Sequence, residues 1–340
     1  MEKWARVGSY LEKYADDLVF DQFQEGYLKR EGIYDFMKDV PVPMSTGDVV
    51  DFHTQKGLDV LNVAKNMIRI VGINPQFPYV ESYLKYIHKY FDKNVVEAVI
   101  RDGEQRAQKG SVEEALIYFR AALVMEPKQK YALYDYGLAT RQICEGDSED
   151  EAYRGAMKAD SISAFEELSA EYPDFAPAYF YLGYIYMNMG LYTKAKLVFE
   201  LFLKLCDESN PENGKDMLDP AVLEEQMKEA KERVVQLDEP MKIENGVNHI
   251  LTGRLDMGIQ ILEPYVGGNY DKWWPLHYYL GIAYESVGRV DDAIQRFQNV
   301  LQLHPSHAET MNELAELYEA KGDIVMGEKY RNKIQLVKEN

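Results

Sequence analysis

Residues 278–305 read YYLGIAYESVGRVDDAIQRFQNVLQLHP, and residues 312–333 read NELAELYEAKGDIVMGEKYRNK. The two stretches match at a constant offset of 34 residues. The matched pairs are Leu280 with Leu314, Gly281 with Ala315, Tyr284 with Tyr318, and Gly288 with Gly322. A constant period of this length indicates an array of repeated supersecondary units rather than a chain folded around one core.

Two earlier stretches fit the same frame. Residues 181–202, YLGYIYMNMGLYTKAKLVFELF, carry the matching residues Leu182, Gly183, Tyr186, Gly190, Ala195 and Phe199. In residues 96–129 the matching residues are Gly103, Gly110, Ala115, Phe119, Ala122 and Pro127. Because several units share one frame, the repeat is a strong signal, whereas a single unit would be a weak one.

Each unit reads as two helices joined by a short turn. A glycine ends the first helix, where a left-handed residue is needed, in four units: Gly110, Gly190, Gly288 and Gly322. Small residues let the two helix backbones approach closely: Gly103, Gly137, Gly183 and Gly281 in the first helix, and Ala115, Ala195 and Ala293 in the second. Proline cannot continue an established helix, so Pro127, Pro173 and Pro305 mark its end.

This pattern resembles the tetratricopeptide repeat family, whose 34-residue unit carries large–Leu–Gly–Tyr in its first helix and Ala–Phe–Ala–Pro in its second. The resemblance implies an all-α fold, a right-handed α-solenoid of about six helix-turn-helix units. We expect the units at about 96–129, 130–175, 176–209, 239–273, 274–307 and 308–340. The array therefore covers 96–340, and residues 1–95 form a separate N-terminal helical region.

Two parts of the array depart from the period. In unit 130–175 the spacing from Pro127 to Pro173 indicates about 12 extra residues at the turn inside the repeat. Between units, Asp219 followed by Pro220 has the usual order of a helix start. The apolar pattern that follows predicts an inserted helix over about 219–237, ending before Pro240.

The N-terminal 95 residues leave the repeat frame. Trp4, Val7, Leu11, Tyr14 and Leu18 recur at a spacing of three to four, which predicts one amphipathic helix. A second helix is predicted within 20–37, a break at 39–48, and a third helix ending near Gly72. We interpret the region as a helical cap, because the end unit of a solenoid exposes an apolar face.

Composition restricts the partners. The 340 residues carry 57 acidic and 38 basic side chains, a formal net charge of −19, and no basic block stands out. Phosphate backbones and anionic lipids repel such a chain, so we expect neither nucleic acid nor membrane as a partner. The charged start does not read as a secretory signal. Cys144 and Cys206, far apart and without a metal spacing, predict free thiols in a cytoplasmic protein.

Catalytic and metal motifs are missing from the sequence. It contains no GxSxG, no phosphate-binding glycine loop and no HExxH. Only His304 and His307 lie close together, and they read as turn residues. Residues 146–151, GDSEDE, lack the twelve-residue calcium pattern and read as a solvated loop. We therefore expect no enzyme, no cofactor and no metal.

The family resemblance also implies which side chains of each first helix line the concave groove. Those positions hold Tyr131, Tyr134, Leu138, Arg141, Gln142, Phe180, Tyr184, Met187, Asn188, Tyr278 and Ile282. Towards the C-terminus the same positions become acidic, with Glu285, Glu309, Glu316 and Glu319. The Lys and Asn positions with which some family members clamp acidic peptide tails are apolar or aromatic here, which argues against that ligand.

So many rings would form an apolar patch larger than a monomer normally exposes. Two hypotheses explain how it is covered. In the first, a partner peptide or protein helix lies in the groove. In the second, the chain covers itself, either with the helix at 219–237 or with its N-terminal region. The two hypotheses are compatible, because a partner can displace a self-covering element.

The sequence thus predicts a non-catalytic cytoplasmic scaffold or adaptor that recognises a protein or peptide segment in an aromatic groove. The alternative is a peptide-responsive regulator whose N-terminal helical module acts on a signalling protein. The identity of the partner, the pathway, the role of residues 1–95 and the oligomeric state are left open by the sequence.

Overall fold

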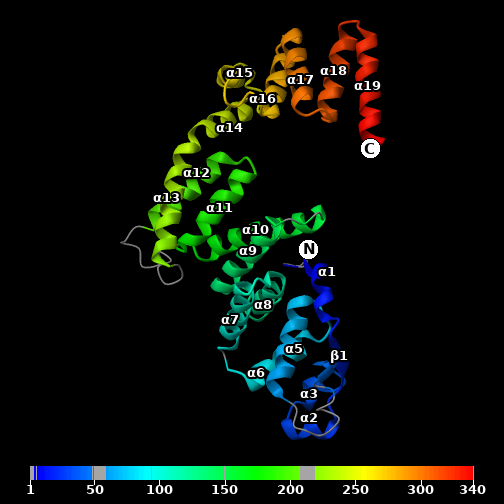
Figure 1. The fold of residues 1–340 in the computed structure, drawn as a ribbon, viewed down its shortest axis with the longest axis vertical. Coiled ribbons are helices and arrows are strands. Elements are labelled where there is room, and N and C mark those ends of the chain that lie inside the picture. The colour runs from blue at the N-terminus through cyan, green and yellow to red at the C-terminus, as the bar shows by residue number, and fades with distance from the viewer. Residues whose placement is uncertain are drawn as a thin grey trace. The chain divides into compact units, whose positions relative to one another are not determined.

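The computed structural model describes the chain except for residues 1–3, 5, 48, 50–58, 93, 147, 149, 207–218 and 340, and the side chains of 338 and 339. The described residues are mainly helical, and consecutive helices pack as pairs, as expected for an all-α solenoid (Figure 1). The chain divides into two compact units. Unit 1 comprises 1–182 and 201–224, and unit 2 comprises 183–200 and 225–340. The boundaries predicted at residue 95 and between repeats stay predictions.

The single helix predicted from Trp4 to Leu18 is wrong. Trp4 has a left-handed backbone with φ of 66°, α1 covers only Gly8–Leu11, and a 3₁₀ helix, η1, covers Glu12–Ala15. Strand β1 follows at Leu18–Asp21 and pairs antiparallel with β2, Val42–Ser45. Prolines 41 and 43 keep the residues before them extended, so the predicted break at 39–48 supplies a strand for β1 to pair with.

Short helices fill the rest of the N-terminal region. The helix predicted within 20–37 is present as α2, Glu25–Glu31, and α3, Tyr34–Met37, with left-handed Gly32 between them. The third predicted helix is described as α5, Val60–Ile73, and its predicted start lies outside the described residues. Helix α6, Val80–Tyr90, completes the region.

A buried arginine fixes the N-terminal segment to unit 1. The guanidinium of Arg120 is 1% exposed and donates to the backbone oxygens of Gly72, at 2.6 Å, and Trp4, at 2.8 Å. Arg6 pairs at 2.8 Å with Asp160, which is also 1% exposed. A buried charge is tolerated when it is hydrogen-bonded in this way. The N-terminal segment therefore covers part of the helices that carry Arg120 and Asp160.

Those helices belong to two helix pairs of unit 1. Helices α7, Val95–Gln108, and α8, Val112–Met125, form the first pair; α9, Lys130–Cys144, and α10, Glu151–Glu171, form the second. The long α10 takes up most of the extra residues that the sequence placed between the two helices of unit 130–175. Helix α11 covers Ala176–Asn188, and α12 covers Tyr192–Leu205.

One glycine–phenylalanine contact recurs in the helix pairs. A Cβ added to Gly103 would lie 2.6 Å from the ring of Phe119, and one added to Gly281 would lie 2.6 Å from the ring of Phe297. The same contact joins Gly137 to Phe165 and Gly183 to Phe199. The small residue of the first helix therefore makes room for a ring of the second, whereas the sequence predicted only a close approach of the two helix backbones. The four turn glycines, 110, 190, 288 and 322, have φ between 73° and 85°.

Helix α13 covers Pro220–Gln236, within the range of the predicted inserted helix. It ends just before α14, Asp238–Leu251. Pro240 explains the break: it has no N–H to donate, and its ring collides with the carbonyl of residue 236 in a continuous helix. In the first turn of α14 the same proline is tolerated, because an N–H there has no partner within the helix.

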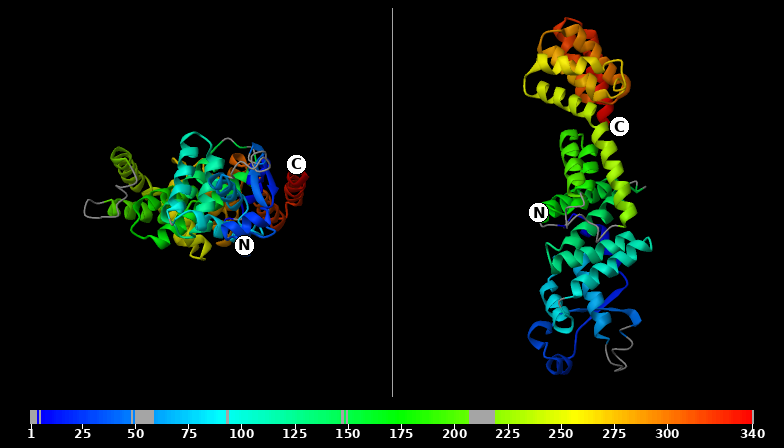
Figure 2. Two further views of the ribbon diagram at one scale, coloured as in Figure 1. Left: turned by 90° about the horizontal axis from the view of Figure 1, so that it is seen from below. Right: turned by 90° about the vertical axis from the view of Figure 1, so that its left-hand side faces the viewer.

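Unit 2 continues as helix pairs. Helix α15, Leu255–Leu262, packs on α14 and runs into a 3₁₀ turn, η2, Glu263–Tyr265. Then come α16, Trp274–Ser286, with α17, Val290–Leu303, and α18, Ala308–Ala320, with α19, Ile324–Glu339. Figures 1 and 2 show these pairs side by side. Their buried apolar residues form one core. None of the described helices combines the length and the apolarity that a membrane crossing requires.

Candidate functional site

The predicted groove residues of α9 split between interior and surface. Tyr134 is 4% exposed and packs edge-on against Phe165 and Phe175. Burial raises its pKa far above the usual tyrosine range. Tyr131 is 37% exposed, Gln142 is exposed, and Leu138 and Arg141 are half-buried. The Arg141 guanidinium lies 5.1 Å from the ring centre of Tyr181. Tyr134 is therefore a core residue, and the rest of this set remains accessible.

On α11 the set divides in the same way. Phe180 is 5% exposed and packs against Phe202, at a ring distance of 5.3 Å. Met187 is half-buried and Asn188 is exposed. The fourth residue, Tyr184, is half-buried, and its neighbours are charged residues of α13.

Helix α13 covers Tyr184. The tyrosine hydroxyl donates to the carboxylate of Glu229, and Arg233 Nε donates back to the same hydroxyl at 3.2 Å. The guanidinium of Arg233 also lies 5.7 Å from the centre of the tyrosine ring. Of the two hypotheses for the covered patch, self-covering by the helix at 219–237 is thus what the structure contains at Tyr184.

The remaining predicted residues, Tyr278 and Ile282, lie half-buried on α16. Tyr278 packs edge-on against Trp274 and tilted against His307. Its pKa is raised by partial burial and then by the negative charges of Glu313, Glu309 and Glu285. We call this set of residues on α16 and α18 (Tyr278, Ile282, Glu285, Glu309 and Glu313) the acidic face.

Two carboxyl groups of the acidic face influence each other electrostatically. Besides burial, the negative charge of Glu313 on α18 raises the pKa of Glu285 on α16. The pKa of each is raised from 4.5, first by burial and then by like charges that include Glu316. Among the described residues, no Lys or Arg forms an ion pair with either. The sequence identified Glu285 and Glu309 but missed Glu313, because its position in the repeat is not one that the family directs to the groove.

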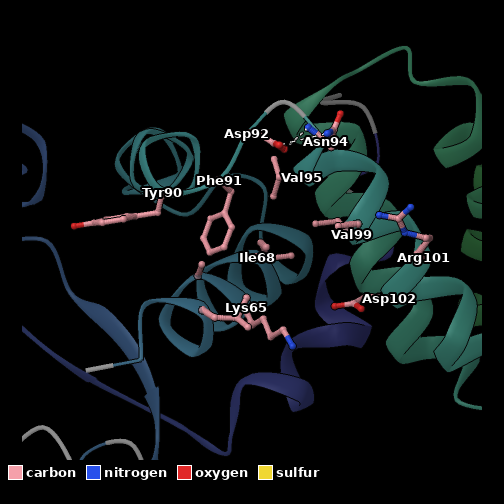
Figure 3. A pocket seen from close by; sticks show the side chains of 13 residues that line it. Lys65, Ile68, Tyr90, Phe91, Asp92, Asn94, Val95, Val99, Arg101 and Asp102 are labelled. Atoms are coloured by element: carbon pink, nitrogen blue, oxygen red, sulfur yellow. Dashed lines mark hydrogen bonds between the residues drawn. The ribbon is translucent and has the colours of Figure 1, made fainter. Parts of the chain in front are cut away.

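A cleft of about 520 Å³ lies between α5 and α7 in unit 1 (Figure 3). Apolar side chains such as Ile68, Phe91 and Val99 line it, and the carboxylate of Asp92 accepts from the backbone N–H of Asn94 at 2.8 Å. Two basic side chains, Lys65 and Arg101, and two acidic ones, Asp92 and Asp102, also line the cleft. Because the charges balance, the cleft does not select a ligand by charge, and the sequence pattern did not predict it.

Catalytic chemistry has little support in the described part of the chain. No group of three or more His, Cys, Asp and Glu there has metal-binding geometry. His307 caps α18 by accepting the N–H of Thr310, as expected for a turn residue. The pKa of Asp135 rises to about 7 through burial and the charge of Glu104. Its neighbour is thus another carboxyl rather than a nucleophile or a histidine, so this pair alone does not make an active site.

Comparison with known families agrees with the helix pairs. A family model described as tetratricopeptide repeat matches residues 176–209, and another with the same description matches residues 278–325. Among curated proteins, none matches the chain in sequence. The two matched segments contain α11–α12 and most of α16–α18, which are the helices that carry the glycine–phenylalanine contacts of unit 2.

Solved structures of repeat proteins resemble the chain distantly. The TPR domain of P58(IPK) is 20% identical over 71% of this chain and 60% of its own length, with a TM-score of 0.41. The APC/C hetero-tetramer Cut9–Hcn1 is 16% identical over 83% of this chain and 50% of its own length, with a TM-score of 0.34. YrrB, a TPR protein with an unusual peptide-binding site, is 14% identical over 65% of this chain and 93% of its own length, with a TM-score of 0.27. At these scores the likenesses carry no conclusion about function.

The family assignment therefore rests on features of the chain itself. These are the two matched segments, the 34-residue period, the left-handed turn glycines and the recurring glycine–phenylalanine contacts. Repeats of this family serve in general as protein-interaction scaffolds. The chain is a tetratricopeptide repeat protein.

Proposed function

We propose that this protein is a non-catalytic scaffold that binds a lysine- or arginine-bearing segment of a partner protein on its acidic face. The observation that carries the proposal is the Glu285–Glu313 pair beside half-buried Tyr278 and Ile282. The apolar part of the face fits the stem or neighbour of a basic side chain, and the carboxyl pair fits its charge.

The electrostatics of the face support a cationic ligand. Two neighbouring carboxyl groups repel each other when both are ionised. A bound ammonium or guanidinium group would relieve this repulsion by donating hydrogen bonds to both carboxylates. The formal net charge of −19 also attracts a basic segment over longer distances. The same charge is why the proposal includes neither nucleic acid nor membrane as a partner.

The proposal places the chain in the cytoplasm, where the free thiols of Cys144 and Cys206 fit a reducing environment. The alternative of a regulator with an effector module at its N-terminus rests on the sequence alone. Of the predicted groove residues, the proposal uses Tyr278 and Ile282. It leaves Tyr134 and Phe180 to the core, because each is about 95% covered by the protein itself.

A peptide-display selection on the full chain tests this function. We expect wild-type protein to enrich peptides with Lys or Arg next to apolar residues. The double substitution Glu285→Gln and Glu313→Gln should abolish that enrichment, because it removes both charges while keeping the shape of the side chains.

The matched control removes two charges elsewhere. Glu224 and Glu232 are exposed on α13, and the Glu224→Gln, Glu232→Gln variant should enrich the same peptides as the wild type. The proposed function is wrong if the wild type does not enrich basic peptides. It is also wrong if the acidic-face variant enriches them as well as the wild type does.

A further inference from the structure

Unit 2 contains a small apolar pocket that no sequence pattern predicted. Its volume is about 130 Å³, and it is lined by Tyr192, Pro240, Ile243, Tyr270 and Trp273. We call it the aromatic pocket. Tyr192 begins α12, Pro240 and Ile243 lie on α14, and the other two rings lie in the segment before α16. Ile243 is 1% exposed, while the three rings are half-buried.

Contacts within the protein hold the segment that carries two of these rings, Tyr270 and Trp273. Tyr270 packs edge-on against Tyr265, with ring centres 5.6 Å apart. In the segment that carries Tyr270 and Trp273, Asp271 Oδ1 accepts the N–H of Gly267 at 2.8 Å. His277, which is 1% exposed, contacts the backbone oxygen of Asp271 at 2.8 Å. A binding site with rings fixed in advance loses little conformational entropy on binding.

Contacts between α12 and α14 fix the other wall of the pocket. The backbone N–H and hydroxyl of Thr193 both donate to Glu244, at 2.7 and 2.9 Å. Lys196 pairs with Asp238 at 2.5 Å. These bonds join α12 to α14 close in sequence to Tyr192 and Pro240.

A negative charge lies beside the pocket. Glu239 precedes Pro240, is exposed, and acts on two neighbouring tyrosines: after burial, its charge is the next cause that raises the pKa of Tyr270 and of Tyr265. Within the described residues, no Lys or Arg pairs with Glu239. Elsewhere in the chain a cation of the protein itself lies over a ring: Arg289 is 4.1 Å from the ring centre of Tyr284, and Arg106 is 3.9 Å from that of Tyr118.

From this arrangement we infer that the aromatic pocket binds a trimethylammonium group, such as that of trimethyllysine or choline. Aromatic rings attract a cation through their quadrupoles, and methyl groups around the nitrogen fill an apolar pocket. An unmethylated ammonium is too strongly hydrated to gain from entering it. The volume equals that of about four water molecules at roughly 30 Å³ each, which admits one compact headgroup. This pocket lies on other helices than the acidic face, and the inference stands without the proposed function.

The test compares choline with 3,3-dimethylbutan-1-ol, which has the same shape but a carbon in place of the charged nitrogen. Both are titrated into the full chain by calorimetry. We expect choline to bind at least about tenfold more tightly than the neutral analogue. Glu239→Gln should weaken choline several-fold and leave the analogue unchanged. Trp273→Leu should abolish choline binding, whereas Tyr131→Leu, which removes an exposed ring elsewhere, should not.

Two results would overturn the inference. One is equal or tighter binding of the neutral analogue, which would make the pocket an ordinary apolar site for an aliphatic side chain. The other is that choline does not bind to the wild type. The Glu239→Gln variant keeps the test valid if Trp273→Leu unfolds, since an exposed, isosteric change leaves the core intact. A short peptide with trimethyllysine then separates the sources: tighter binding than choline assigns the site to modified proteins, and weaker binding assigns it to a small molecule.

Discussion

The glycine opposite each phenylalanine shows how single residues set the distance between two helices. Gly137 of α9 faces Phe165 of α10, and a Cβ at that position would lie 2.9 Å from the ring. Gly155, on α10 itself, has no neighbouring atom within 4 Å of such a Cβ. The two glycines thus belong to the same helix pair but face different environments.

Alanine at these two positions should therefore have opposite effects. We expect Gly137→Ala to reduce the free energy of unfolding by about 1–3 kcal/mol, because the methyl group forces Phe165 away. Gly155→Ala should increase it by up to about 1 kcal/mol, because alanine favours a helix and nothing opposes it. Thermal unfolding followed by circular dichroism measures both. Equal effects of the two substitutions would contradict the close glycine–ring packing of this pair.

At the scale of elements, the covering of Tyr184 by α13 is a contact that can be tested alone. Replacement of Tyr184 by Phe removes the hydroxyl and leaves Glu229 and Arg233 without it. We expect a loss of about 1 kcal/mol in stability and faster amide exchange in α13. Tyr131→Phe, at an exposed ring, should change neither.

Phe180→Ala sets the scale for that measurement. Because Phe180 is a core residue, its truncation should cost about 3–5 kcal/mol. If Tyr184→Phe left exchange in α13 unchanged, other contacts would hold the helix, and the Tyr184 hydroxyl would have no part in fixing it.

Sequence reasoning worked best for elements whose signals are local. The turn glycines, the small residues and the helix over 219–237 all follow from short spacings, and the helices lie where those spacings put them. Strands β1 and β2 were missed, because each is only four residues long and forms by pairing with a segment more than 20 residues away. The aperiodic N-terminal region gave no signal for that pairing.

At the scale of the whole chain, the candidate sites depend on residues that are far apart in the sequence. The family frame selected Tyr278 and Ile282, but it also selected Tyr134 and Phe180, which the neighbouring rings bury. The frame fixes which way a position points and says nothing of how large the neighbours are. The aromatic pocket combines three separate segments, so no local pattern could have predicted it.

The pH dependence of binding tests the acidic face most directly. The pKa values of Glu285 and Glu313 are raised above 4.5, and only the ionised pair attracts a cation. Affinity for a lysine-bearing peptide should therefore fall as the pH falls from 7.5 through these raised pKa values, while the peptide keeps its charge. Loss of both charges at pH 7.5 should weaken binding about fivefold or more, as for an ion pair worth about 1 kcal/mol.

The decisive measurement is the dissociation constant of one selected lysine-bearing peptide at pH 7.5 and pH 5, determined by calorimetry for the wild type and for the Glu285→Gln, Glu313→Gln variant. Our account predicts that the wild type binds more tightly at pH 7.5 than at pH 5, and that the variant binds weakly at both. Equal affinities of the two proteins at pH 7.5, or a wild-type affinity that rises as the pH falls, would contradict it.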